Sequence, residues 1–313
     1  MTKLAFLFPG QGSQSVGMLA GLADSPAAQT VLSQANAALG EDLIELMQNG
    51  PAEQLGLTTN TQPAMLAAAY ATYAAWLEAG GRIPDLLAGH SLGEYTALVA
   101  AQSLDLGDAI RTVRIRANAM QSAVPVGVGA MAAILGLEAA KVQAACAHAN
   151  LEFTELGIVE AVNFNDPAQT VIAGHAAAVN KAIEHCKTAG AKRGLLLPVS
   201  APFHSSLMKP AADKLETHLE GITFREPKIS IINNIDVKTE SEAAAIKAAL
   251  VRQACGAVRW VETIQAMQAQ GVTTIVECGP GKALAGMVKR IAPDMVVHNV
   301  FDAASIAAVK ELL

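Results

Sequence analysis

A serine between two glycines is the clearest sign of chemistry in this sequence, in the stretch GHSLG at residues 89–93. Residues 85–89 read as a short buried strand, and residues 92–101 read as the helix that follows it. A Gly-x-Ser-x-Gly turn between a strand and a helix is a nucleophile elbow, in which the glycines permit a sharp bend. The helix N-terminus directs free N–H groups at the serine, where they can stabilise a tetrahedral oxyanion. Ser91 is therefore predicted to carry an acyl group as a serine ester, whereas the pentapeptide without this context would indicate only a helix cap.

A serine hydroxyl needs a general base before it becomes nucleophilic, and the sequence offers seven histidines. Three of them fall inside polar or amphipathic helical segments and are expected to be solvated: His148, His185 and His218. His90 adjoins Ser91, but one turn does not easily present both side chains to the same reacting atom. His204 follows a predicted strand, and loops at the carboxyl ends of strands are where parallel sheets build their sites. Position alone leaves His204 as either the base or a structural turn histidine.

Two arginines compete for a functional role on the helix predicted at residues 106–121. Apolar side chains recur along this helix at the spacing of one face: Ile110, Val113, Ala117 and Met120. Arg114 and Arg116 flank this stripe on opposite edges, so the periodicity does not choose between them. By spacing alone, Arg116 is more typical of a surface cation whose aliphatic stem lies along the protein.

Strand and helix signals alternate along most of the chain. This alternation predicts an α/β fold with a mostly parallel sheet flanked by helices, like the core of the α/β-hydrolases. The predicted strands cover residues 3–9, 85–89, 228–235 and 273–279. The predicted helices cover residues 62–79, 92–101, 106–121, 205–220, 241–254, 259–270 and 282–291. The helix at 62–79 is expected to have Thr61 as its N-cap and Pro63 in its first turn.

The middle of the chain has a different order of elements, βαββαβ, which is that of the ferredoxin-like unit. Its predicted strands cover residues 130–137, 159–165, 169–174 and 193–199, and its predicted helices cover 138–149 and 176–189. We therefore expect two subdomains. A large α/β catalytic subdomain is formed by residues 1–126 and 200–313, and a small ferredoxin-like subdomain is inserted into it at residues 127–199.

The composition describes a protein with a large buried core, because 52% of its 313 residues are hydrophobic and only 16% are charged. No apolar run is long enough to span a bilayer, and the N-terminal segment lacks a signal-peptide cleavage site. A cytoplasmic protein is expected, with a monomer as the default. The formal net charge of −6 argues against nucleic acid as a partner.

Nothing in the sequence indicates a metal ion or a cofactor. The four cysteines are scattered and form no Cys-x-x-Cys pair: Cys146, Cys186, Cys255 and Cys278. The stretch GPGK at 279–282 lacks the spacing of a phosphate-binding loop and the Ser or Thr that follows its lysine. We therefore expect no metal, no disulfide and no cofactor.

Short motifs spread over essentially the whole chain resemble those of the malonyl-CoA:acyl carrier protein transacylases, acyltransferases of fatty-acid and polyketide synthesis. Each motif is common when taken alone, but the full set in this order is specific. The motifs are FPGQGSQ (8–14), TQPA (61–64), GHSLGEY (89–95), RIRANAMQ (114–121), VNFNDPAQTVIAG (162–174), PFHSSLM (202–208), NN (233–234), VRQ (251–253) and ECGPGK (277–282).

This resemblance implies a role for each catalytic residue. It implies Ser91 as the nucleophile and His204 as its base, with an oxyanion hole formed by the backbone N–H groups of Gln11 and Leu92. It also implies that Gln253 lies beside His204, where the family orients the imidazole with a main-chain carbonyl in place of a carboxylate. Thioester exchange tolerates such a dyad, because a thiolate leaves with much less protonation than an amine.

The resemblance also implies a malonyl site. Arg116 is implied to bind the malonyl carboxylate with the help of Gln62, since a planar guanidinium can pair with a carboxylate through two hydrogen bonds. A bulky ring at Phe203 is expected to exclude the α-methyl group of methylmalonate. The remaining residues implied to contribute to the substrate site are His90, Met120 and Asn163.

The function implied is transfer of a malonyl group from malonyl-CoA to the phosphopantetheine thiol of acyl carrier protein. The transfer proceeds through a malonyl-serine intermediate and supplies fatty-acid synthesis. Three alternatives share parts of this pattern. A trans-acting acyltransferase would serve a polyketide synthase, a serine thioesterase or other hydrolase would let water attack the acyl-serine, and a silent acyltransferase-like module would belong to a larger synthase. Product analysis separates transfer from hydrolysis.

Overall fold

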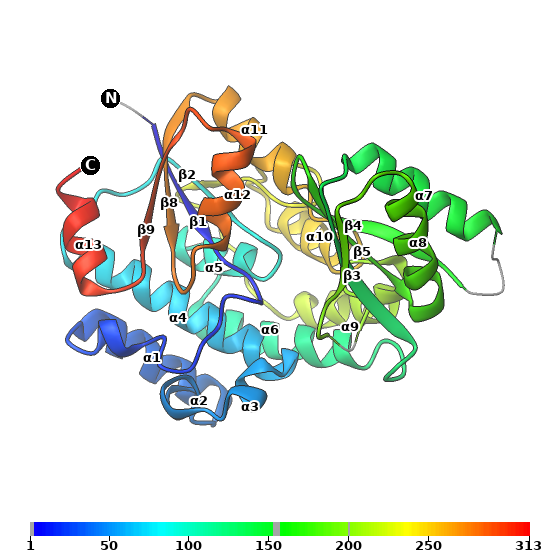
Figure 1. Cartoon of the computed structure of the whole chain (residues 1–313). Coiled ribbons are helices and arrows are strands. Elements are labelled where there is room, and N and C mark those ends of the chain that lie inside the picture. Colours follow the sequence, from blue (N-terminus) through cyan, green and yellow to red (C-terminus); the bar gives the residue numbers. More distant parts are fainter. Residues whose placement is uncertain (1–2, 153–156, 200) are drawn as a thin grey trace.

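A five-stranded parallel sheet forms the centre of the larger lobe (Figure 1). The computed structural model describes residues 3–152, 157–199 and 201–313. The strands run in the order β7-β2-β1-β8-β9. Their bounds are β1 Lys3–Phe8, β2 Leu86–Gly89, β7 Ser230–Ile231, β8 Val272–Cys278 and β9 Val296–Val300. The predicted parallel sheet flanked by helices is confirmed.

Helices cover both faces of this sheet, and β1 explains why. Its side chains alternate between two cores: Leu4, Phe6 and Phe8 enter one hydrophobic cluster, and Ala5 and Leu7 enter another. A strand buried on both faces reads as a continuous apolar run, as KLAFLF does. The first face carries α1 Pro26–Leu39, α4 Thr58–Glu78, α5 Gly93–Ala100, α6 Leu106–Gln121, α9 Lys209–Glu220, α10 Ala243–Ala254 and α13 Ala303–Lys310. The second face carries α11 Trp260–Ala269 and α12 Ala283–Ile291. Shorter elements are η1 Ala20–Leu22, α2 Leu43–Asn49, α3 Ala52–Gly56 and η3 Ser206–Met208.

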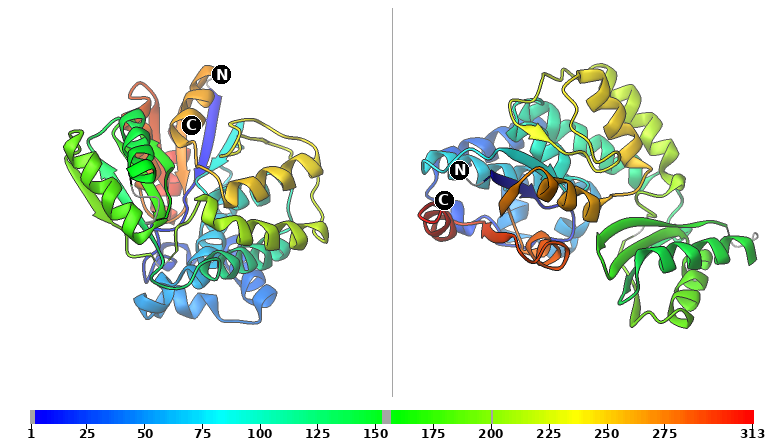
Figure 2. Two further views of the ribbon diagram at one scale, coloured as in Figure 1. Left: turned by 90° about the vertical axis from the view of Figure 1, so that its right-hand side faces the viewer. Right: turned by 90° about the horizontal axis from the view of Figure 1, so that it is seen from above.

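The smaller lobe is a four-stranded antiparallel sheet with two helices against it, and it lies beside the larger lobe (Figures 1 and 2). Its strands are β3 Gly129–Leu135, β4 Val159–Asp166, β5 Gln169–His175 and β6 Arg193–Leu196, and its helices are α7 Ala139–Glu152 and α8 Ala176–Thr188. The order across the sheet is β4-β5-β3-β6, which is the arrangement of a ferredoxin-like unit. The predicted fold of this lobe is confirmed, whereas the subdomain boundaries stay a prediction.

The two lobes are joined along the outer edge of β4. Val258, in the segment between α10 and α11, forms a parallel bridge with Asn163. Its N–H donates to the carbonyl of Val162 at 2.8 Å, and its carbonyl accepts from the N–H of Phe164 at 3.0 Å. A strand edge of the small sheet is thus completed by a residue of the large lobe.

Helix α4 begins earlier than the sequence indicates. It starts at Thr58, and its N-cap is Leu57 with no capping side chain. The prediction of Thr61 as N-cap is wrong, because Thr61 already lies within the helical segment. Its hydroxyl donates to the carbonyl of Leu55 at 2.6 Å and caps no backbone N–H among the described residues. Pro63 therefore falls beyond the first turn. Most side chains of α4 are buried, so tertiary packing outweighs the local capping signal.

The strand predicted at 228–235 is mostly wrong, because β7 covers only Ser230–Ile231. The backbone N–H groups of Asn233 and Asn234 leave the sheet and bind the carbonyl of Lys238 and the side chain of Glu94. The strand predicted at 193–199 ends at Leu196. Strand β9 and helix α13 were not predicted.

Candidate active site

Ser91 occupies a sharp turn between the end of β2 and the start of α5. It has a φ of +52°, a left-handed conformation that is uncommon for a residue with a side chain. The flanking glycines are required by close packing. A Cβ on Gly89 would lie 1.8 Å from the carbonyl carbon of Gly93, and a Cβ on Gly93 would lie 2.1 Å from the carbonyl oxygen of Phe8. The GxSxG spacing therefore follows from the contacts of this turn.

Ser91 and His204 lie in direct contact, although they are far apart in the sequence. Ser91 Oγ is 2.6 Å from His204 Nε2, and His204 Nδ1 is 2.9 Å from the main-chain carbonyl oxygen of Gln253. Because a carbonyl can only accept, Nδ1 carries the proton, and Nε2 is left to accept the hydrogen bond of the serine hydroxyl. This is the tautomer that a general base beside a serine needs.

His204 is neutral in this environment. Burial, reinforced by the positive charge of Arg116, lowers the pKa of His204 to about 3. Its side chain has 5% exposure, and its φ is +63°. Within the described residues no carboxylate forms a hydrogen bond with His204, and the main-chain carbonyl of Gln253 takes the place of one in orienting its ring.

Arg116 is the arginine that points into the site. It has 2% exposure, and its Nη1 donates to Gln62 Oε1 at 2.7 Å. Its Nη2 donates to Gln253 Oε1 at 3.0 Å and to Ser91 Oγ at 3.1 Å. Arg114, which the spacing could not separate from Arg116, instead forms an ion pair with Glu41.

These groups surround one cavity of about 120 Å³. Of the residues named from the sequence, all but Gln253 line it: Gln11, Gln62, His90, Ser91, Leu92, Arg116, Met120, Asn163, Phe203 and His204. Gln253 lies behind the cavity and contacts both Arg116 and His204. Three apolar residues of the lining were missed, because they belong to the small lobe and its return segment: Met131, Leu197 and Val199.

Two backbone N–H groups at the cavity are free to bind an oxyanion. In the part of the chain that the structure describes, the N–H groups of Gln11 and Leu92 donate to no protein acceptor. Gln11 follows β1 and Leu92 precedes α5, and both line the cavity. The neighbouring strands β1 and β2 therefore bring these two N–H groups from separate segments to the same cavity.

Two asparagines of the small lobe lie next to the site: Asn163 lines the cavity, and Asn165 binds His90. Asn163 Oδ1 is buried and has no hydrogen-bond partner among the described residues. Asn165, which the sequence did not indicate, pairs through Oδ1 with His90 Nε2 at 2.9 Å. Burial lowers the pKa of His90, so its ring is neutral and donates this hydrogen bond. His90 thus belongs to the wall of the cavity, and His204 is the imidazole that contacts the serine.

Two further polar residues behind the site were missed. Glu94 and Asn234 are almost fully buried. The Asn234 side chain binds the backbone of the serine turn, and the Glu94 carboxylate accepts from the backbone N–H of Asn234. A signal was present, since a glutamate in an otherwise apolar helix next to an elbow is unusual. Among residues 3–152, 157–199 and 201–313, no three His, Cys, Asp or Glu side chains gather as metal ligands. No helix in these ranges is long and apolar enough to cross a membrane.

A serine, an imidazole, free oxyanion donors and a buried guanidinium in one cavity define a site for transfer of an acidic acyl group. The family model described as acyl transferase domain matches residues 5–309. A malonyl CoA-acyl carrier protein transacylase from Escherichia coli is 51% identical over 313 residues, covering all of both chains. A relative of the same name from Haemophilus influenzae is 52% identical over 315 residues, again covering both chains fully.

Solved structures agree in fold over the whole chain. An acyl-carrier-protein S-malonyltransferase from Burkholderia pseudomallei is 59% identical, with a TM-score of 0.96 and 99% of each chain covered. A malonyl-transacylase in complex with its type II PKS acyl-carrier protein is 48% identical, with a TM-score of 0.96 and 100% of each chain covered. The chain belongs to the malonyl CoA-acyl carrier protein transacylases of the acyl transferase family.

Proposed function

We propose that this protein transfers a malonyl group from malonyl-CoA to the phosphopantetheine thiol of an acyl carrier protein, through a malonyl ester on Ser91. The observation that carries the proposal is the position of Arg116. Its guanidinium is buried at 2% exposure and donates to Ser91 Oγ at 3.1 Å, yet no carboxylate pairs with it among the described residues. A carboxylate on the acyl group supplies the missing counter-charge beside the reacting atom.

In the first half-reaction the Ser91 hydroxyl attacks the thioester carbonyl of malonyl-CoA, and His204 Nε2 accepts the hydroxyl proton. The N–H groups of Gln11 and Leu92 stabilise the oxyanion that forms, a contribution typically of about 3 kcal/mol per donor. The carbon–sulfur bond then breaks, and the coenzyme A thiolate takes the proton from His204. Malonyl-serine remains in the cavity.

In the second half-reaction the carrier thiol gives its proton to His204 and attacks the malonyl-serine ester. The Ser91 oxygen leaves and regains the proton from His204, which restores the resting enzyme. A thiol with a pKa near 8.5 is a good leaving group and a good nucleophile. The main-chain carbonyl of Gln253 is therefore a sufficient partner for the imidazole, since no poorly leaving amine has to be protonated.

Arg116 favours malonyl over acetyl in two ways. A hydrogen bond to a charged partner is worth about 1.5–3 kcal/mol, and a guanidinium can make two to one carboxylate. An acetyl group also leaves the buried guanidinium without a counter-charge, so the uncharged competitor is disfavoured. Phe203, beside His204 in the cavity wall, restricts the space for a substituent on the α-carbon.

The physiological carrier has two candidates. We favour the carrier of fatty-acid synthesis, while one relative of comparable similarity is a malonyl-transacylase in complex with its type II PKS acyl-carrier protein. The chemistry at Ser91 is the same for both carriers. We further propose that the protein acts as a monomer in the cytoplasm and without a cofactor.

The proposed function is tested by measuring the malonyl group bound to the protein and the products that the protein releases. Incubation with malonyl-CoA should add one malonyl mass to the intact protein, and Ser91→Ala should abolish the addition. With a carrier protein present, malonyl-carrier should form in excess over free malonate. Free malonate as the main product would make the protein a hydrolase, and a labelled Ser91→Ala would remove Ser91 as the nucleophile.

A further inference from the structure

One buried acid at the site has no role in the reaction described above. Glu94 lies in the first turn of α5, just beyond Ser91, and has 3% exposure. Burial raises the pKa of Glu94 to about 7, which reflects the cost of placing a carboxylate there. The cavity around Ser91 does not include Glu94 among its lining residues, so it does not contact the substrate. A buried carboxyl group retained behind an active site calls for a physical explanation.

Both contacts of this carboxylate lead back to the active site. Glu94 Oε2 accepts hydrogen bonds from the backbone N–H of Asn234 at 2.9 Å and from Gln253 Nε2 at 3.0 Å. We propose that Glu94 is a positioning residue for acyl transfer, which fixes Asn234 and Gln253 so that these two hold Ser91 and Arg116 in reacting geometry. The inference rests on the proposed function for the identity of the acyl group.

Asn234 holds the serine turn from both sides. Its Oδ1 accepts the backbone N–H of Ser91 at 2.7 Å, and its Nδ2 donates to the carbonyl of Gly89 at 2.8 Å. Ser91 has a φ of +52°, a conformation that persists only where the surroundings hold it. Because the Glu94 carboxylate binds the backbone N–H of Asn234, it fixes the position of the Asn234 side chain relative to the serine turn.

Gln253 connects the carboxylate to the other reacting groups. Its Nε2 also donates to the carbonyl of Ser91 at 3.0 Å, and its Oε1 accepts from Arg116 Nη2 at 3.0 Å. The amide orientation is unambiguous, because the Ser91 carbonyl beside Nε2 can only accept and the Arg116 guanidinium beside Oε1 can only donate. Its main-chain carbonyl binds His204. Displacement of Gln253 therefore moves the guanidinium and the imidazole together.

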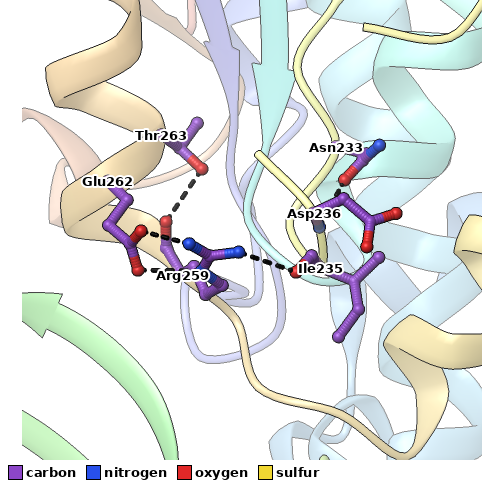
Figure 3. A network of polar contacts seen from close by, with 6 residues as sticks. All are labelled: Asn233, Ile235, Asp236, Arg259, Glu262 and Thr263. Atoms are coloured by element: carbon purple, nitrogen blue, oxygen red, sulfur yellow. Dashed lines mark hydrogen bonds and ion pairs between the residues drawn. The ribbon is translucent and has the colours of Figure 1, made fainter. Parts of the chain in front are cut away.

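The loop that carries Asn234 is anchored separately on its outer side (Figure 3). Arg259 donates from Nη1 to the carbonyl of Ile235 at 3.4 Å and from its backbone N–H to the carbonyl of Asn234 at 3.2 Å. Glu262 fixes the guanidinium of Arg259, and Asn233 Oδ1 accepts the backbone N–H of Asp236 at 2.8 Å. Loss of the Glu94 carboxylate should therefore release the inner contacts while the outer anchor keeps the loop in place.

Variants of Glu94 separate the length of the side chain from its charge. Glu94→Gln keeps the length and one oxygen acceptor, Glu94→Asp keeps the charge but is shorter, and Glu94→Ala removes both. We expect kcat for malonyl transfer to fall by about a hundredfold in Glu94→Ala, the effect of a misplacement near 1 Å, with a smaller change in KM. Glu94→Asp should lose nearly as much, and Glu94→Gln should recover most of the rate.

A second readout does not depend on malonyl chemistry. The rate at which a fluorophosphonate labels Ser91, with loss of fluoride, reports the nucleophile's position for any acyl group. This labelling rate should rank the Glu94 variants in the same order as kcat does, with Glu94→Gln faster than Glu94→Asp and Glu94→Ala. A wild-type protein that reacts with the probe but transfers no malonyl group would contradict the proposed function and leave this inference standing.

Glu277 provides the matched control, since it is a carboxylate with 0% exposure outside the cavity. It accepts from the N–H groups of Leu284 and Ala285 and from Asn299. Glu277→Ala should lower stability and leave kcat and the labelling rate of the folded fraction unchanged. The inference is overturned if folded Glu94→Ala or Glu94→Asp labels Ser91 at the wild-type rate, or if Glu94→Gln loses as much as Glu94→Ala. Should Glu94→Ala fail to fold, the contrast between Asp and Gln decides.

Discussion

Among the described residues, the guanidinium of Arg116 donates its hydrogen bonds only to neutral groups, namely Gln62, Gln253 and Ser91, and it lies over the ring of Tyr95. Burial lowers its pKa, yet the ordinary value of an arginine is so high that the group stays charged. Hydrogen bonds to neutral acceptors hold the group in place without neutralising it. The site is therefore prepared for an anion that arrives with the substrate.

Arg116→Ala should lower malonyl transfer by about 10- to 100-fold, the equivalent of one charged hydrogen bond, and should spare or raise acetyl transfer. The measurement is kcat/KM for malonyl-CoA and acetyl-CoA with the same carrier. Arg114→Ala is the matched control, because this arginine pairs with Glu41 outside the cavity. Equal losses for the two acyl groups would remove Arg116 from the specificity role.

His204 makes stability depend on pH. Its pKa is about 3 in the folded protein and near 6.5 in an unfolded chain, so the unfolded state binds more protons between these values. The free energy of unfolding should therefore fall as the pH drops below about 6.5 towards 3. His204→Gln should flatten this part of the profile, which denaturant titrations at pH 7 and pH 5 can measure. A parallel profile for the variant would contradict the neutral, buried imidazole.

The residues of the active site could be predicted only in part from the sequence. The elbow around Ser91 was evident because its glycines and its position between a strand and a helix are local features. Arg114 and Arg116 could not be separated by spacing, because the choice is made by Gln62 on α4 and Gln253 on α10, both distant in the sequence. Long-range partners of this kind leave no periodic trace.

The strand–turn–helix element of β2 and α5 depends on close backbone packing. Gly93→Ala would place a methyl group 2.1 Å from the carbonyl oxygen of Phe8. We expect a loss of about 3 kcal/mol in the free energy of unfolding, together with loss of Ser91 labelling. Gly221→Ala is the control, since its new methyl group would meet nothing closer than 3.8 Å. A Gly93→Ala protein of wild-type stability would show that the turn can relax.

Strands that are buried on both faces could be predicted from the sequence. Segments whose conformation depends on side-chain contacts with distant residues could not. The run KLAFLF reads as a central strand because both its faces enter cores. The loop after β7 has a strand-like sequence, but Asn233 and Asn234 bind groups elsewhere in place of a strand partner. Its Val237 has a φ of +57°, which no local propensity indicates for a β-branched residue.

At the scale of the whole molecule, an ion pair joins the two lobes. Arg290 on α12 donates to Asp166 of β4 at 2.7 Å, and Asp166 has 3% side-chain exposure. Arg290→Ala should lower the free energy of unfolding by about 1 kcal/mol, because the arginine is half-exposed and solvent screens the pair. Arg111→Ala, which breaks an exposed helix-surface pair with Asp108, should have almost no effect. Denaturant titrations of both variants check the contrast.

The bridge between Val258 and Asn163 also governs what the small lobe can be on its own. In the intact chain, one border of its sheet is closed by Val258, and the other border is β6, where Leu195 and Leu196 are 46% and 57% exposed. The β6 edge is open in the intact chain as well, and excision of the small lobe would also open the β4 edge that Val258 covers. Open strand edges pair between molecules. An isolated small lobe should therefore aggregate, because the large lobe no longer covers the edge of its β4 strand.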